Sequence, residues 1–357
     1  MIRPPYPACA YAAIVLALGS LPAFAQEKTV SGEAKFELHN DWAARADERS
    51  NKRNDAWLKI EAVTDVRVSP GLTFKTQVTV EPVSDAEPGK DRYFGDQGAY
   101  LQNIYLEYET GPFALRGGKF GQKFGTAWEA APGIWGREFA KNYELAEQWG
   151  FAADYTLAAG DAGKHTVTAG SFFADTTVLS ESVVTNRHRT RHSAGGAGNT
   201  ENFSNFSLAL AGNDIKALPG LRYNLAWTSR DSDGAGEKTE RGIVGGLQFG
   251  AKLGSVDVTP LIEWANFDNR EGTSGKDANY LTTALRFDYG KWNLALARTD
   301  RRTQESGSAA VDDQSSQASI GYAFENGFTV STGYRNVEES SKVTETLGVL
   351  VEYILKY

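Results

Sequence analysis

Apolar and polar residues alternate along most of this sequence once its first 25 residues are passed. Near the C-terminus, Val349, Val351 and Tyr353 are apolar, whereas Glu352 and Lys356 fall on the other face and are charged. Successive side chains of a β-strand point to opposite faces of a sheet, so a period of two residues predicts strands. The same alternation recurs from residue 29 onward, and it predicts an all-β fold.

The pattern predicts about sixteen strands joined by two kinds of connection. The strands are expected at residues 29–39, 56–68, 72–82, 100–109, 113–120, 147–157, 164–175, 202–213, 220–229, 241–252, 255–265, 279–289, 291–300, 316–324, 327–336 and 343–357. Tight turns rich in Gly, Pro, Asn and Ser are expected at 69–71, 110–112, 253–255, 290–291 and 326–327. Longer polar loops are expected at 41–54, 83–98, 121–146, 176–201, 230–240, 266–277, 301–314 and 337–342.

The two faces of these strands distinguish a membrane barrel from a soluble one. Charged residues repeatedly share one face, as a water-filled lumen requires, whereas a soluble barrel buries apolar side chains inside. Short turns alternate with long loops, and the last residue, Tyr357, is aromatic. A strand of a soluble sandwich would alternate too, but it would not explain these features. The sequence therefore predicts a transmembrane antiparallel β-barrel. The expected number of strands is even, so both termini of the chain should lie on the periplasmic side.

The first 25 residues have the composition of a secretory signal peptide. A basic Arg3 precedes an apolar stretch at 10–21, and Ala23 and Ala25 form a small-x-small cleavage site. The apolar stretch is too short to span a membrane as a helix. We therefore expect a signal peptide at 1–25 and a single outer-membrane barrel domain at 26–357.

Composition limits the chemistry that the barrel domain can perform. The only cysteine, Cys9, and the only methionine, Met1, both lie in the expected signal peptide, so the domain has no thiol chemistry. The sequence carries a net charge of -8, and we expect no nucleic-acid partner. Four histidines without a recognisable nucleophile and base give little support to catalysis. We expect no catalytic residue, no metal site and no cofactor.

The connection at 121–146 differs from the other loops because it is rich in aromatic residues. An apolar loop of this length outside a barrel would leave an exposed apolar patch, so we expect it to fold into the lumen. Its charged side chains would then line the narrowest part of a pore: Glu129, Arg137, Glu138, Lys141 and Glu144. The alternative is a loop that packs outside, on its neighbours or on another subunit.

Two short segments beside this loop resemble Gram-negative porins, in particular the proteobacterial group that includes general-diffusion and phosphate-selective porins. The segments are 115–120, which reads LRGGKF, and 148–151, which reads QWGF. The resemblance implies a homotrimer of sixteen-stranded barrels in which the third loop forms a constriction opposite basic wall residues. The bases expected on the lumen face are Lys35, Lys59, Lys75, Arg116, Arg222, Arg286 and Arg335.

These observations predict an outer-membrane porin for the passive diffusion of ions and small hydrophilic solutes. Its partners would be outer-membrane lipid, lipopolysaccharide, further copies of the chain and the solutes. Acidic residues outnumber basic ones on the expected lumen face, which predicts a weak preference for cations. The alternatives are a porin selective for phosphate or another small anion, an outer-membrane barrel enzyme and an adhesion barrel.

Overall fold

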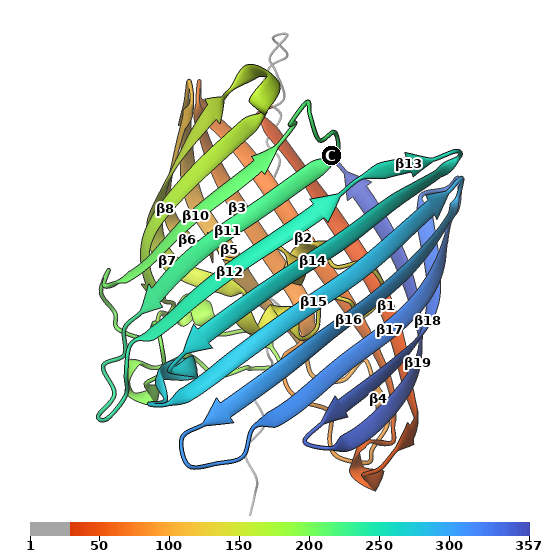
Figure 1. Cartoon of the computed structure of the whole chain (residues 1–357). Coiled ribbons are helices and arrows are strands. Elements are labelled where there is room, and N and C mark those ends of the chain that lie inside the picture. Colours follow the sequence, from red (N-terminus) through yellow and green to blue (C-terminus); the bar gives the residue numbers. More distant parts are fainter. Residues whose placement is uncertain (1–28) are drawn as a thin grey trace, which may run out of the picture.

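The computed structural model describes residues 29–357, and the predicted signal peptide lies outside the described residues. Within them the chain forms one closed, tilted β-barrel (Figure 1). In the same range, no helix is both long and apolar enough to cross a membrane. The predicted all-β fold is confirmed.

The bounds of the elements follow chain order. The strands are β1 (Val30–Ala46), β2 (Asn54–Ser69), β3 (Leu72–Pro82), β4 (Arg92–Tyr93), β5 (Gln97–Thr110), β6 (Phe113–Gln122), β7 (Leu145–Ala158), β8 (Lys164–Ala174), β9 (Val183–Val184), β10 (Asn205–Asn213), β11 (Leu221–Arg230), β12 (Glu240–Phe249), β13 (Ala251–Leu253), β14 (Val256–Asp268), β15 (Lys276–Tyr289), β16 (Trp292–Glu305), β17 (Val311–Ala323), β18 (Phe328–Glu339) and β19 (Lys342–Lys356). The helical turns are η1 (Arg49–Asn51), α1 (Ala127–Ala130), η2 (Ala140–Tyr143), η3 (Gly160–Ala162), η4 (Val178–Ser180), η5 (His192–Ala194) and η6 (Arg270–Gly272).

The barrel wall has sixteen antiparallel strands, as predicted. The two-residue strands β4 and β9 belong to loops, and β12 and β13 form one wall strand that is interrupted at Gly250. Each wall strand pairs with its neighbours in sequence, and β1 pairs with both β2 and β19, which closes the sheet. Closure leaves no free edge, so every wall strand has partners on both sides.

The two ends of the barrel differ in their connections. Tight turns join the strands at 70–71, 111–112, 254–255 and 290–291, at the end where β1 begins and β19 ends. The longer loops lie at the opposite end. This is the arrangement of outer-membrane barrels, whose short turns face the periplasm and whose long loops face outside.

Four predicted loops are wrong in their extent, because the strands run further than the alternation indicated. The loops observed are 47–53, 269–275, 306–310 and 340–341, where 41–54, 266–277, 301–314 and 337–342 were expected. Near the loop end, both faces of the strands carry polar residues, so the period of two disappears although the pairing continues. Extension of strands above the apolar band explains why alternation does not mark these ends.

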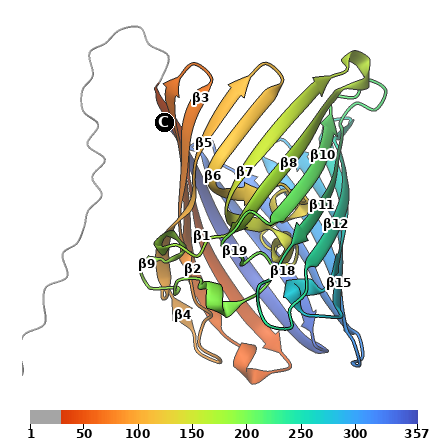
Figure 2. The same cartoon turned by 90° about the vertical axis from the view of Figure 1, so that its left-hand side faces the viewer.

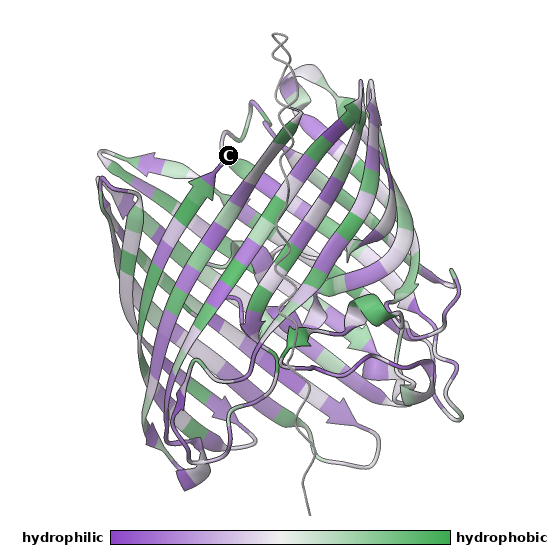
Figure 3. Cartoon of the chain, turned by 180° about the vertical axis from the view of Figure 1, so that it is seen from behind, coloured by the Kyte–Doolittle hydropathy of each residue, from purple (hydrophilic) through white to green (hydrophobic). Residues whose placement is uncertain are grey.

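The outer face of the wall is apolar, and the inner face is polar. On β1, Leu38 is 42% exposed and Trp42 is 52% exposed on the outside, whereas Glu37 and His39, on either side of Leu38 in the sequence, are buried on the lumen side. Figure 3 shows the resulting stripes of green and purple along the strands. Exposed apolar side chains at this density would be unfavourable in water, but they suit contact with lipid.

Candidate functional site: the third loop and the channel beside it

The third loop (residues 123–144) leaves β6, enters the lumen and returns to β7, as predicted. Figure 2 shows its helical turns inside the barrel, away from the rim. The loop contacts wall strands far away in sequence: Thr126 bonds Glu263 on β14, Pro132 bonds Gln317 on β17, and Trp135 bonds Asp41 on β1. It therefore crosses the lumen and divides it.

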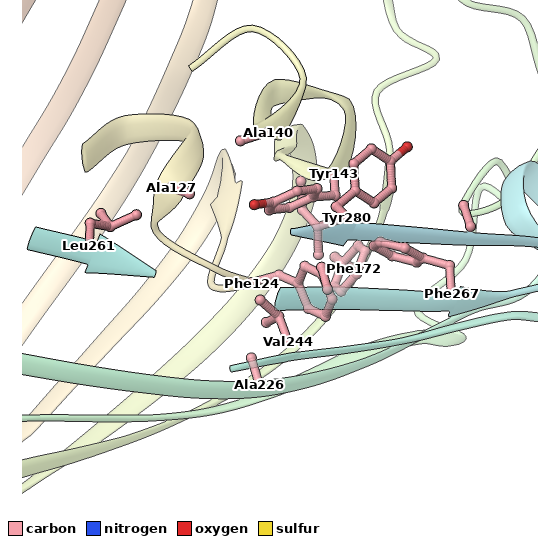
Figure 4. Packing of buried hydrophobic residues seen from close by; sticks show 13 residues of the cluster. Phe124, Ala127, Ala140, Tyr143, Phe172, Ala226, Val244, Leu261, Phe267 and Tyr280 are labelled. Carbon is pink, nitrogen blue, oxygen red and sulfur yellow. The ribbon is translucent and has the colours of Figure 1, made fainter. Parts of the chain in front are cut away.

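An apolar cluster holds the loop against one half of the wall. Phe124, Ala127, Ala140 and Tyr143 of the loop are buried, and they pack on inward side chains of β8, β11, β12, β14 and β15 (Figure 4). The wall members of the cluster are Leu145 at the start of β7 and Phe172, Ala226, Val244, Leu261, Ala265, Phe267, Ala278 and Tyr280. Burial of these aromatic rings removes apolar surface from the water of the lumen and fixes the loop on this side.

Glu263 on β14 anchors both ends of the loop through its carboxylate. One oxygen accepts from the backbone N–H and the hydroxyl of Thr126 at 2.7 and 2.9 Å, and from Asn224 at 3.0 Å. The other accepts from Ala127 N at 2.9 Å and from the Tyr143 hydroxyl at 2.8 Å. Because Glu263 is only 1% exposed, these bonds compensate for its lost hydration. Its place on the lumen face follows from alternation, but its anchoring role could not be read from the sequence.

Trp135 anchors the tip of the loop on the opposite part of the wall. Its indole Nε1 donates to Asp41 Oδ1 at 3.2 Å, and the Arg335 guanidinium lies 5.1 Å from its ring. The indole rests on Gly348 of β19, where a Cβ atom would lie 2.2 Å from the ring. The glycine is needed here for this close approach of the ring to the wall.

Two cavities remain open between the loop and the wall, and β18 and β19 as well as β1, β2 and β3 border the outer one. The outer cavity, of about 730 Å³, lies toward the long loops and is bordered by residues such as Asn51 and Asp85. The inner cavity, of about 520 Å³, lies deeper and is bordered by β2, β3, β5, β6 and the third loop. Glu81 lines both cavities, so they adjoin at this side chain.

The structure separates the five charged residues that were predicted for the constriction. Glu129, Arg137, Lys141 and Glu144 line the inner cavity together. Glu138 lines the outer cavity instead, where it forms an ion pair with Arg335. Burial raises the pKa of the Glu144 carboxyl, and burial together with Lys59 and Arg137 lowers the pKa of the Lys141 ammonium. Both groups are thereby shifted toward their neutral forms.

All seven predicted wall bases lie on the lumen face, and six of them form ion pairs. Lys35 pairs with Glu37 and Glu352 at 2.6 and 2.8 Å, and Lys59 pairs with Glu61 at 2.8 Å. The remaining pairs are Lys75 with Glu107, Arg116 with Asp154, Arg286 with Asp288, and Arg335 with Glu138, while Arg222 shares the inward face of β11 with Asn224. The wall near the loop is therefore mixed in charge. This differs from the basic wall opposite an acidic loop that the resemblance implied.

A buried ionic network closes the wall where β6 turns into the lumen, and sequence reasoning missed it. The pairing of β6 with β5 ends at Lys119, and β9 continues the pairing along the end of β5. Lys119 Nζ is fully buried and contacts Glu147, Asp175 and the Leu179 carbonyl at 2.7–2.8 Å. These contacts bind the fourth loop (residues 175–204) into the wall and close the lumen on this side.

The fold and this internal loop define an outer-membrane β-barrel channel. The chain matches the Gram-negative porin family over residues 12–353, and it belongs to that family. It is an outer-membrane porin. No curated protein matches the sequence.

Three solved structures share the fold over nearly their full length. OprB of Pseudomonas putida is 11% identical, with a TM-score of 0.68 and coverage of 92% of this chain and 94% of that one. The outer-membrane channel DcaP of Acinetobacter baumannii is 10% identical, with a TM-score of 0.59 and coverage of 91% and 96%. OmpT of Vibrio cholerae, in its trimer form, is 10% identical, with a TM-score of 0.54 and coverage of 92% and 99%. Because the sequence identity to these three structures is only 10–11%, the likeness shows a shared fold and nothing more specific.

Proposed function

We propose that the barrel carries ions and small hydrophilic solutes across the outer membrane by passive diffusion. The observation that supports this most directly is the pair of adjoining polar cavities beside the third loop. A solute would enter the outer cavity from the long-loop end, pass Glu81, and continue along the inner cavity toward the periplasmic turns. Transport would need no bond to form or break, and the proposal includes no enzymatic step.

The charges along this path favour cations weakly. Six acidic and three basic side chains line the outer cavity, so cations would be concentrated before they reach the loop. Five acidic and five basic side chains line the inner cavity, which gives it no net charge. Screening over about 8–10 Å limits the influence of the outer charges on the narrow region. Preference for one sign of charge should therefore be modest.

A pore selective for phosphate or another small anion is the second candidate. Lys123, Arg137 and Lys141 on the third loop line the inner cavity, and together they could attract an anion. Glu129 and Glu144 line the same cavity and oppose this attraction. The pairing of the wall bases with wall acids also reduces the positive potential available, so we place this candidate second.

We further propose that the porin works as a homotrimer in contact with outer-membrane lipid and lipopolysaccharide. The family resemblance and the trimer form of the Vibrio cholerae OmpT structure support the trimer. The apolar outer face, with exposed side chains such as Leu208 and Leu247, supports the lipid contact.

Swelling of liposomes that contain the purified protein tests passive diffusion. Swelling in isotonic sugar solutions should be rapid for small sugars and should slow as the sugar becomes larger, since a size limit is the property of a water-filled pore. Protein that is folded and inserted but gives no swelling with any small sugar would contradict the proposal. Saturation of the flux at low concentration of one solute would instead favour a selective binding channel.

A further inference from the structure

Three cavities meet at one carboxylate, that of Glu81 near the end of β3. Glu81 lines the outer and the inner cavity, and it also lines a third cavity of about 350 Å³ beside the second loop (residues 83–96). Its side chain is 27% exposed, so its charge is open to the water in these spaces. An ion that moves from the outer to the inner cavity passes this carboxylate, and a charge at such a junction acts on the ion at short range.

Tyr100 of β5 fixes the position of this carboxylate. Its hydroxyl donates to Glu81 Oε1 at 2.5 Å from the neighbouring strand. The residue directly opposite Glu81 on β5 is Gly98, which has no side chain, so the tyrosine two positions further along reaches the carboxylate diagonally. A second partner lies close by, because Lys59 Nζ is 3.7 Å from Glu81 Oε2. The bond from Tyr100 therefore limits how closely the carboxylate approaches Lys59 and keeps its charge available to the pore.

Arg187 of the fourth loop packs on the face of the Tyr100 ring. The centre of its guanidinium lies 3.8 Å from the ring centroid, as in a cation–π stack. Each nitrogen of this group has an acceptor: Nε donates to the Ser180 carbonyl at 2.7 Å, and Nη1 and Nη2 donate to the two carboxylate oxygens of Glu147 at 2.9 and 2.6 Å. A guanidinium that is fixed in this way restricts where the ring can lie.

The backbone that carries Arg187 is fixed as well. The two residues of β9, just before it, pair with β5, and the Arg187 N–H donates to the Ser182 hydroxyl at 2.8 Å. Glu147, which accepts from the guanidinium, also pairs with Lys119 in the buried ionic network at the start of the fourth loop. A continuous series of contacts thus connects this network, through Arg187 and Tyr100, to the carboxylate where the cavities meet.

We propose that Arg187 and Tyr100 are positioning residues for Glu81, and that Glu81 sets the ion preference at the junction of the cavities. The fourth loop would then influence the pore although Arg187 itself does not line the inner cavity. This inference rests on the channel proposed above, and it adds the residue that carries the selectivity and the two residues that hold it in place.

Neutralisation of Glu81 tests whether its charge matters. E81Q keeps the shape of the side chain and removes its charge, so the reversal potential in a salt gradient should shift toward anions. The matched control is E305Q, which removes an exposed carboxylate at the loop end of β16, away from the three cavities. It should leave the reversal potential unchanged. Equal shifts in the two variants, or no shift in E81Q, would overturn the inference.

Y100F and R187K test the positioning without a change of net charge. Y100F removes only the hydroxyl, and R187K keeps the positive charge but loses the flat stack on the ring and the paired bonds to Glu147. Each should shift the reversal potential in the same direction as E81Q, by a smaller amount, because the released carboxylate moves toward Lys59. The control R191K changes an exposed arginine of the same loop and should produce no shift.

Combination with E81Q separates an action through Glu81 from a direct effect on the pore. If Arg187 and Tyr100 act through the carboxylate, neither Y100F nor R187K should add a shift in the E81Q background. Shifts of equal size in both backgrounds, or no shift in the wild-type background, would overturn the inference. Heat-modifiable migration on gels shows that each variant is folded, and Y100F, the smaller change, serves alone if R187K does not assemble. Wild-type protein that inserts without conducting would contradict the channel itself, whereas a conducting wild type with unshifted variants would overturn this inference alone.

Discussion

Glu263 offers the clearest connection between one side chain and the shape of the pore. The variant E263L would leave the Thr126, Ala127 and Tyr143 donors without their acceptor in a buried place. A loss of hydrogen bonds to a buried charge costs about 3 kcal/mol, so the loop should become mobile. We expect faster cleavage of the loop by added protease and more current noise in single channels, in a barrel that still resists heat.

The matched control for this prediction is E305L, at the loop end of β16 and away from the Glu263 carboxylate. It removes the same charge without touching the third loop, so noise and protease cleavage should remain as in the wild type. If E263L and E305L behave alike, Glu263 does not hold the loop.

Gly348 supports the tip of the loop by a different physical means, the close approach of the Trp135 ring. The variant G348A would place a Cβ atom 2.2 Å from the Trp135 ring, so the indole has to move away from the wall. We expect the bond from Trp135 to Asp41 to break and the outer cavity to change its shape, which should alter single-channel conductance. Indole fluorescence should report the displaced ring. The variant G245A, which meets only the side chain of Leu225 at 3.2 Å on the outer face, should leave both measurements unchanged.

Among the elements, alternation was enough to predict all sixteen wall strands, whereas the inward fold of the third loop was predicted from its many aromatic residues. The strand ends at the loop side were missed because both faces are polar there, as on β16 beyond Arg298. The contacts of the loop could not be predicted either. Thr126 and Glu263 are 137 residues apart, and their meeting depends on the barrel's stagger and on side-chain packing, which the sequence pattern does not specify.

The third loop should set the conductance of the channel. If a short Gly-Ser linker replaces residues 126–141, the division of the lumen disappears, and both conductance and the size limit for sugars should rise. The barrel should still assemble, because its wall pairing does not include this segment. Heat-modifiable migration on gels would confirm assembly. A folded deletion variant with unaltered conductance and size limit would show that the loop is not the narrowest part.

The seam between the first and last strands depends on Tyr357. Its hydroxyl bonds the Thr64 hydroxyl at 2.7 Å and donates to the Val63 carbonyl at 3.1 Å, and its backbone bonds Gly32. The variant Y357A should lower the stability of the closed barrel by about 1–2 kcal/mol and slow its insertion. Y357F keeps the ring and removes only the hydroxyl, so it should show a smaller loss. Equal heat resistance in all three proteins would rule out this role.

In the whole molecule, the ion preference of the pore should depend on pH. Glu144 has a raised pKa, so it loses its negative charge earlier than an ordinary glutamate as pH falls. Lys141 has a lowered pKa, so it loses its positive charge earlier as pH rises. Both effects make the pore less favourable to cations in acid and more favourable in alkali. Reversal potentials in a salt gradient should shift accordingly, and E144Q should weaken the acid part of the shift.

The double variant E129Q/E144Q separates the inner cavity from the outer one. Removal of two acids from a cavity of balanced charge should shift the reversal potential toward anions. E138Q should shift it less, because Glu138 lies in the outer cavity and is neutralised by Arg335. A larger shift for E138Q than for the double variant would place the selective region in the outer cavity.

Single-channel recording in planar bilayers would show whether the barrel conducts ions beside the third loop. The purified wild-type protein should produce discrete conductance steps that grow in proportion to salt concentration, because ions cross through water beside the third loop. The reversal potential at neutral pH should show a weak cation preference. Folded protein that inserts without conductance steps would contradict the channel itself, and a clear anion preference would contradict the proposed balance of charges along its path.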